Sequence, residues 1–427
     1  MRKIFFIILI SCANFAFAQF NITIKSAGSS TAQEAYFYTI EGSKEVLIGK
    51  ALNKSGIWQL RHPQAYAGMM KAYFPDLNYS LSFISENKDV EIALNFSGNK
   101  VSQVSYIDKA NQEMNKVQNI GQKVDNILPA LKQIQAFYTP QDDFYTALTK
   151  EISVLSKNSQ VSSSFPFINY YQSNYKKFIA DSETGNAASS EDIIQFFRNS
   201  GEYLESSSLM RPILIEYLGQ TTKEGMGNAV ENLLKAVDVE SPRGQLILSE
   251  LIDIFDVYAL TDLKENYLGY AQDLKCTITP RLKSTIEVNV KTSVGSNFED
   301  YQFVSPINTD AKSLYQIKSK NKIIVFWSST CSHCQTDLPK FITKYKELKS
   351  RGIEIIGLSL DADRESYELM AQSYPWISDS ELKGWRSSVN EKYNVNATPT
   401  YFILDEQNKI VSKPNTAMDA LAYFGLK

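Results

Sequence analysis

One segment near the end of the chain constrains the fold most, because an apolar run leads directly into two cysteines. Residues 322–327 are predicted to form a buried strand, and Cys331 and Cys334 follow at the start of a helical pattern. Free N–H groups and the helix dipole at that position favour the thiolate of Cys331. Cys334 lies one turn further along, where it can resolve a mixed disulfide formed on the first sulfur. The spacing predicts thiol-disulfide exchange.

A second feature downstream belongs with the two cysteines. Thr398 and Pro399 come just before the apolar run 401–404. A proline directly before such a strand, in this context, predicts a cis peptide bond that faces the dithiol.

With both features present, residues 295–427 resemble the thioredoxin fold, and most closely its TlpA/ResA-like branch of envelope proteins. The resemblance implies that Cys331 attacks and Cys334 resolves. It also implies that the main chain around Thr398 and Pro399 binds the substrate protein in an extended conformation. Apart from the redox-active disulfide of the two cysteines, we expect no cofactor and no metal.

Two further site residues follow from the same resemblance. Asp337 stands three positions after the second cysteine, where this branch often carries a glutamate. Cytosolic thioredoxins keep a buried aspartate where this chain has Val325, so Asp337 or solvent must accept the proton of Cys334. The alternative for Asp337 is a solvated acid that satisfies the helix dipole. His333, between the cysteines, occupies the place of a histidine in the oxidant DsbA and is expected to act at the substrate-binding face.

The two residues predict opposite redox directions. A cation or N–H donor at His333 stabilises the Cys331 thiolate and favours an oxidant. A carboxylate at Asp337 raises thiol pKa values, which is typical of a reductant. The residues leave the direction open, and the family resemblance favours reduction.

Other interpretations of the cysteines remain open. A Cys-x-x-Cys pair can form half of a zinc site, but a structural zinc usually needs four ligands, and few candidates remain. Outside the N-terminal region these are Cys276, His62 and His333. Cys276, at the end of a helical pattern, is expected to be an inert buried residue. A peroxiredoxin, and a thioredoxin-shaped binding module with an idle dithiol, are further alternatives.

The N-terminus predicts export. Basic residues at positions 2 and 3 precede an apolar run, and Ala16-Phe17-Ala18 fits a small-x-small cleavage site, so residues 1–18 are predicted to be a signal peptide. We therefore expect a soluble protein of the periplasm or cell envelope. The alternative is a lipid anchor on Cys12, which lies in a sequence that also fits a lipoprotein cleavage box.

Composition and hydrophobic periodicity predict which partners are excluded and how the remaining regions of the chain fold. The net charge is −3, from 44 basic and 47 acidic residues, so no nucleic-acid partner is expected. Residues 19–99 alternate apolar and polar side chains between turn signals, which predicts a small antiparallel β-sandwich. This segment resembles the β-domain often found before envelope thioredoxin-like domains in Bacteroidetes. Residues 100–285 are predicted to be helical, and 290–427 to form the thioredoxin-like domain.

Boundaries inside these regions follow from capping signals. Helices are predicted to start at Thr139-Pro140, Ser189, Ser241-Pro242 and Thr416, with a loop at 181–190 and a strand at 286–290. In the last domain the predicted order is strand 322–327, helix 332–350 kinked at Pro339, strand 352–360, helices near 364–373 and 385–393, and a hairpin through 407–408. Trp376 is expected in the core.

These observations predict an envelope enzyme that reduces disulfides in exported proteins, such as a cytochrome apoprotein during cytochrome c maturation. A membrane thiol-disulfide protein would supply its electrons. An oxidant of exported proteins and a non-catalytic binding protein are the alternatives. The oligomeric state is not predicted.

Overall fold

The computed structural model of the protein describes residues 19–28, 31–98, 100–157, 162–180 and 187–426. The predicted signal peptide with Cys12, and residues 181–186 of the predicted loop, lie outside the described residues. The chain forms two compact units, Met1–Ala187 with Gly201–Leu209, and Ala188–Ser200 with Met210–Lys427. The helices of the middle region are divided between these units.

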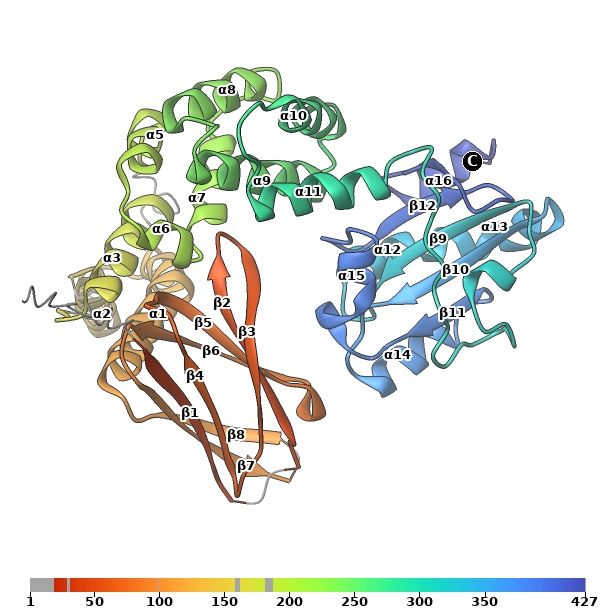
Figure 1. The fold of residues 1–427 in the computed structure, drawn as a ribbon. Coiled ribbons are helices and arrows are strands. Elements are labelled where there is room, and N and C mark those ends of the chain that lie inside the picture. The colour runs from red at the N-terminus through yellow and green to blue at the C-terminus, as the bar shows by residue number, and fades with distance from the viewer. Residues whose placement is uncertain (1–18, 29–30, 99, 158–161, 181–186, 427) are drawn as a thin grey trace, which may run out of the picture. The chain divides into compact units, whose positions relative to one another are not determined.

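The first unit contains the predicted β-sandwich. Its two four-stranded sheets have the orders β4-β1-β7-β8 and β3-β2-β5-β6 (Figure 1). The strands are β1 (Phe20–Ala27), β2 (Glu34–Glu41), β3 (Lys44–Leu52), β4 (Ile57–His62), β5 (Ala67–Phe74), β6 (Tyr79–Glu86), β7 (Val90–Ser97) and β8 (Lys100–Tyr106). Because β1 pairs with β7 in parallel, the first sheet is mixed, which the predicted antiparallel sandwich did not include; the other strand pairs of the two sheets are antiparallel as predicted.

Period-two alternation fills the space between the sheets. Ile22 and Ile24 on β1 are fully buried, as is Trp58 on the neighbouring strand, while the residues between them face outward. This side-chain arrangement confirms the alternation seen in the sequence.

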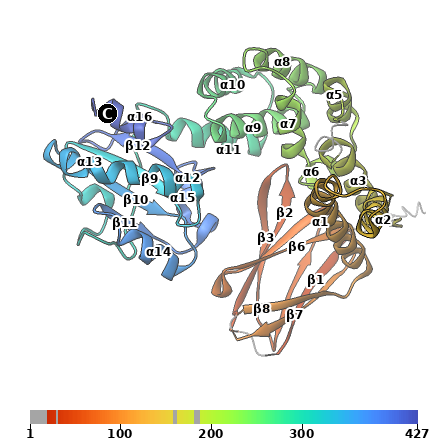
Figure 2. The same cartoon turned by 180° about the vertical axis from the view of Figure 1, so that it is seen from behind.

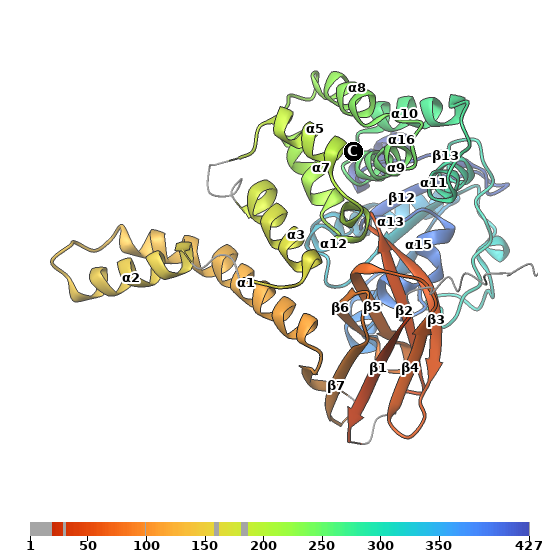
Figure 3. The ribbon, with the colours of Figure 1, turned by 60° about the vertical axis from the view of Figure 1, so that its left-hand side comes forward.

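The first unit also holds several helices. They are α1 (Lys109–Gln135), α2 (Asp143–Lys157), α3 (Pro166–Tyr175), a π-helical turn (Lys176–Ala180) and α6 (Tyr203–Ser206). Helices α1 and α2 lie side by side (Figure 3). The helix predicted to start at Thr139 begins only at Asp143, because the Asp142 carboxylate accepts from the backbone and hydroxyl of Thr139 and closes a turn there instead.

A helical bundle opens the second unit. Its helices are α5 (Ser190–Asn199), α7 (Met210–Gly219), α8 (Met226–Val237), α9 (Pro242–Val257), α10 (Thr261–Asp273) and α11 (Pro280–Lys291). Ser189 and Ser241 cap α5 and α9 as predicted. Every residue from Gly244 to Phe255 is buried, so α9 is the central helix of the bundle.

The strand predicted at 286–290 is wrong, because these residues belong to α11. Thr279 caps this helix by accepting from the N–H of Leu282, and Pro280 occupies its first turn. The buried residues Leu282, Thr285 and Asn289 are spaced at three and four positions, which is the period of a helix. The capping residues at the start of α11 and its buried face outweigh the strand preference of the β-branched residues near the end of this helix.

The C-terminal part of the second unit is the predicted thioredoxin-like domain. Its five-stranded sheet has the order β11-β10-β9-β12-β13, with β12 antiparallel to β9 (Figures 1 and 2). The strands are β9 (Asn321–Trp327), β10 (Ile353–Ser359), β11 (Ile377–Ser380), β12 (Thr400–Leu404) and β13 (Ile410–Ser412). The helices are α12 (Ser332–Asp337), α13 (Pro339–Ser350), α14 (Arg364–Ala371), α15 (Ser388–Lys392) and α16 (Ala417–Tyr423).

Both faces of this sheet are covered. Helices α13, α14 and α16 form one core with alternate residues of β9 and β12, and Trp376 is buried in it as predicted. The segment around Phe298 and Tyr301 packs with α15 on the other face. The long helix predicted at 332–350 is divided into α12 and α13 at Leu338, directly before Pro339. This break leaves a short helix that carries the cysteines at the end of β9.

Candidate functional site

The dithiol lies at the N-terminus of α12. Cys331 is the N-cap of this helix, and its Sγ accepts from the backbone N–H of Cys334 at 3.3 Å. Both are free thiols; Cys331 is partly exposed, whereas Cys334 is buried. β9 is buried along nearly its whole length and ends shortly before Cys331. The sheet therefore positions the two sulfurs at the C-terminal end of this strand.

The proline loop lies beside the first cysteine, as predicted. The Thr398-Pro399 peptide bond is cis. The Sγ of Cys331 donates to the carbonyl oxygen of Thr398 at 3.2 Å, so the loop and the dithiol are in direct contact. These four residues therefore form one site.

The two thiols differ in acidity. Burial alone would raise the pKa of the Cys331 thiol, but hydrogen bonds with the side chains of Cys334 and Thr398, and from the backbone N–H groups of Cys334 and His333, hold that pKa below its usual value. Burial, together with the hydrogen bond to Cys331, raises the pKa of Cys334 to about 12. The outer thiol therefore ionises more readily than the inner thiol, which is held in its protonated form.

Asp337 lies at the end of α12, with a side chain that is largely buried. One carboxylate oxygen accepts from Lys340 Nζ at 2.8 Å, and the other accepts from the Tyr401 hydroxyl at 2.7 Å and the Ala417 N–H at 2.8 Å. Burial would raise the pKa of this carboxyl, but these three donors lower it on balance. Since none of these bonds goes to a sulfur, the acid/base role of Asp337 stays a prediction.

His333 is exposed on the first turn of α12. Its backbone N–H contributes to the lowered pKa of Cys331. The predicted role of its imidazole at the substrate-binding face therefore stays a prediction.

Asp361 was not predicted from the sequence, although it holds the loop before the dithiol. Its carboxylate accepts from the Ser328 hydroxyl at 2.8 Å, from the N–H and hydroxyl of Ser329 at 3.0 and 2.8 Å, and from the Ser359 hydroxyl at 2.7 Å. The available signal was an acid placed directly after a predicted strand, next in the sheet to the one that carries the cysteines. Asp361 thus fixes the exit from β9.

Cys276 is partly exposed, accepts a hydrogen bond from the Gln245 side chain at 3.3 Å, and lies in the loop between α10 and α11.

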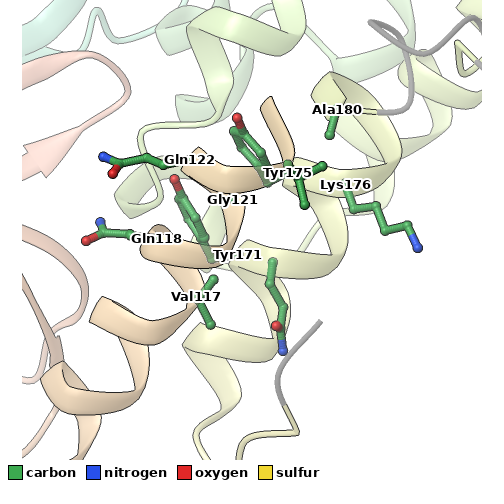
Figure 4. A pocket seen from close by; sticks show the side chains of 10 residues that line it. Val117, Gln118, Gly121, Gln122, Tyr171, Tyr175, Lys176 and Ala180 are labelled. Carbon is green, nitrogen blue, oxygen red and sulfur yellow. The ribbon is translucent and has the colours of Figure 1, made fainter. Parts of the chain in front are cut away.

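In the first unit, a cavity of about 340 Å³ lies between α1, α3 and the π-helical turn (Figure 4). Tyrosine rings, glutamine amides and Lys176 line this cavity without a thiol, so it offers no place for thiol chemistry. Among the described residues, no helix is both long and apolar enough to span a bilayer.

Comparison with known proteins agrees with this geometry. A family model described as thioredoxin-like matches residues 319–410. The thiol-disulfide oxidoreductase ResA of Bacillus subtilis is 25% identical over 126 residues, and ResA of Bacillus cereus is 28% identical over 104 residues. These matches span 28% and 23% of this chain, and 68% and 57% of the two relatives.

Solved structures give similar matches. The thioredoxin domain of a thiol-disulfide oxidoreductase from Bacteroides vulgatus is 24% identical; the alignment covers 31% of this chain and 96% of that domain, with a TM-score of 0.29. The family model confirms that the C-terminal domain is thioredoxin-like, and the sequence of this domain is similar to that of the ResA thiol-disulfide oxidoreductases. The chain thus carries an oxidoreductase domain of the thiol-disulfide class.

Proposed function

We propose that this protein is a thiol-disulfide oxidoreductase of the bacterial cell envelope that reduces disulfide bonds in exported proteins. The observation that carries the proposal is the unequal pair of thiols, with a partly exposed Cys331 of lowered pKa and a buried Cys334 of raised pKa. The contact between Cys331 and Thr398 supports substrate binding along the proline loop.

The proposed reaction begins when the Cys331 thiolate attacks one sulfur of a substrate disulfide. The substrate S–S bond breaks, a mixed disulfide forms, and the departing sulfur takes up a proton. Cys334 then loses its proton and attacks the Sγ of Cys331, which releases the second substrate sulfur as a thiol. Two electrons pass to the substrate, and a Cys331–Cys334 disulfide remains. Asp337, ionised at neutral pH, is the proposed acceptor for the proton of Cys334.

The oxidised enzyme then needs an electron donor. We propose a membrane thiol-disulfide protein for this step, and an exported protein such as a cytochrome apoprotein as the substrate. The predicted signal peptide supports the envelope location, with a lipid anchor on Cys12 as the alternative.

One observation favours the opposite direction. A lowered pKa of Cys331 stabilises the reduced form of the enzyme, which would make the dithiol a better oxidant. Redox titration of the wild-type dithiol against glutathione buffers decides between the two. A reduction potential near that of DsbA, about −120 mV, would exclude the proposed role as a reductant, while a potential near that of thioredoxin, about −270 mV, would support it.

A trapping experiment tests whether the dithiol acts on proteins at all. The Cys334→Ala variant cannot resolve a mixed disulfide, so an enzyme with this mechanism should accumulate covalent complexes with its substrates. Cys331→Ala, which lacks the attacking sulfur, is the matched control. If neither variant forms complexes in the envelope of the producing cell, the protein is a binding module with an idle dithiol.

A further inference from the structure

The proline loop of the dithiol site is attached to the helical bundle of the second unit by side-chain hydrogen bonds. Asn394 Nδ2 donates to Asn289 Oδ1 on α11 at 3.1 Å, and both side chains are buried. Asn396 Nδ2 donates to Asp256 Oδ2 on α9 at 3.3 Å. Two residues of one short loop are therefore held by two different helices.

The two attachments form a single chain of bonds. Asn396 Nδ2 also donates to Asn394 Oδ1 at 3.1 Å, which links the two loop residues to each other. At one end Asn289 donates to the carbonyl of Thr285 within α11 at 2.9 Å. At the other end the second oxygen of Asp256 forms an ion pair with Lys264 of α10. Each end of the chain is thus fixed within the bundle.

This chain ends close to the reacting sulfur. Asn396 precedes Thr398 by two residues, and the carbonyl oxygen of Thr398 accepts from Cys331 Sγ. A change in the position of the loop would therefore change the hydrogen bonding of the sulfur. The bundle thus has a direct structural route to the site.

We propose that the helical bundle positions the proline loop against the dithiol through these amide side chains, with Asp256 as the positioning residue that anchors the loop. This inference rests on the proposed function, because it assigns the bundle a part in the same reaction. It gives residues 210–291 a role besides that of a spacer between domains.

The test compares Asp256→Ala with the wild-type full-length chain, and reads the pH dependence of Cys331 alkylation by iodoacetamide. The hydrogen bond with the Thr398 side chain lowers the pKa of Cys331, so a released loop, which moves this side chain away, should raise the midpoint of the alkylation profile. We expect a rise of about 0.5 pH unit, which corresponds to about a threefold slower reaction well below the midpoint. Asp256→Asn keeps an oxygen that can accept from Asn396, and should restore most of the wild-type midpoint.

Two controls separate positioning from stability. Asp262→Ala removes an exposed acid in the first turn of α10 and should leave the midpoint unchanged. If Asp256→Ala does not fold, Asn396→Ala removes the same bond from the loop side and should raise the midpoint similarly. A lower melting temperature with an unmoved midpoint would overturn the inference, because Asp256 would then only stabilise the bundle.

The outcome is distinct from failure of the proposed function. If Cys331 of the wild-type chain does not react with iodoacetamide, the proposed function fails first. If Cys331 of the wild type reacts and Asp256→Ala shares its midpoint, only the positioning role is lost.

Discussion

Among single residues, the two sulfurs of the dithiol should differ in reactivity. The pKa of Cys331 lies below its usual value, whereas that of Cys334 is raised to about 12. We therefore expect iodoacetamide at neutral pH to modify Cys331 at least about a hundredfold faster than Cys334, since only the thiolate reacts. Mass spectrometry of the two labelled sulfurs from about pH 5 to 9 measures this ratio. Equal rates would contradict the assignment of attacking and resolving cysteine.

Asp337 is a second residue whose charge should affect the thiols. A nearby carboxylate raises thiol pKa values, so Asp337→Asn should move the alkylation midpoint of Cys331 to lower pH, by a few tenths of a unit. The same change weakens the bond to the Ala417 N–H at the start of α16. Asp419→Asn, which alters the capping box of α16, controls for loss of that helix. An unaltered pH profile in Asp337→Asn would end its acid/base assignment.

The sequence predicted the residues that meet at the dithiol site more readily than the residues that hold them in place. Cys331, Cys334 and Pro399 were predicted because their roles require particular residue types at particular spacings. Asp361 and Asp256 act across gaps of many residues in the sequence, and each is an ordinary acid on an ordinary element. The residues that hydrogen-bond to these two acids can be identified only when the packing of the strands and helices is known.

For whole elements, helix α11 shows which local signals outweigh β-propensity. Residues 286–290 include three β-branched side chains, which favour a strand, yet the helix is fixed at its start. We expect Thr279→Ala to lower the free energy of unfolding by about 1 kcal/mol, because the N–H of Leu282 loses its cap. Urea denaturation measures this change.

The Thr279→Ser variant is the matched control, since it keeps a hydroxyl that can accept from Leu282 and should lose little stability. A loss in Thr279→Ala no larger than that of the serine variant would mean that packing of Leu282 and Thr285, not the cap, fixes the start of α11.

In the molecule as a whole, the sequence predicted the order of β, helical and thioredoxin-like regions, because each has its own hydrophobic period. It did not predict that β1 pairs in parallel with β7, since the partner of a strand depends on packing across the whole sandwich. Nor did it predict the junction between the bundle and the C-terminal domain of the second unit, where the contacts join residues far apart in the sequence.

That junction should give the second unit a pH-dependent stability. Lys413, after β13, lies near Lys264, Asp256 and Glu265 of the bundle. Burial and the charge of Lys264 lower its pKa to about 8, whereas in the unfolded chain lysine titrates near 10.4. Between these two values the unfolded chain binds more protons, so the contribution of Lys413 to stability must increase as pH rises, and it is least favourable below about pH 8.

The Lys413→Met variant removes this titration and keeps a flexible apolar side chain beside Phe402, whose ring the lysine ammonium covers at 5.0 Å. The free energy of unfolding of the wild type, measured by urea denaturation relative to this variant, should therefore rise from about pH 8 to about pH 10. Lys409→Met on the same hairpin, where the lysine side chain is exposed, should show no such rise. A difference between wild type and Lys413→Met that does not depend on pH would mean that Lys413 keeps its charge in the folded protein. The junction would then be hydrated, and the bundle would be less closely joined to the loop that faces the dithiol.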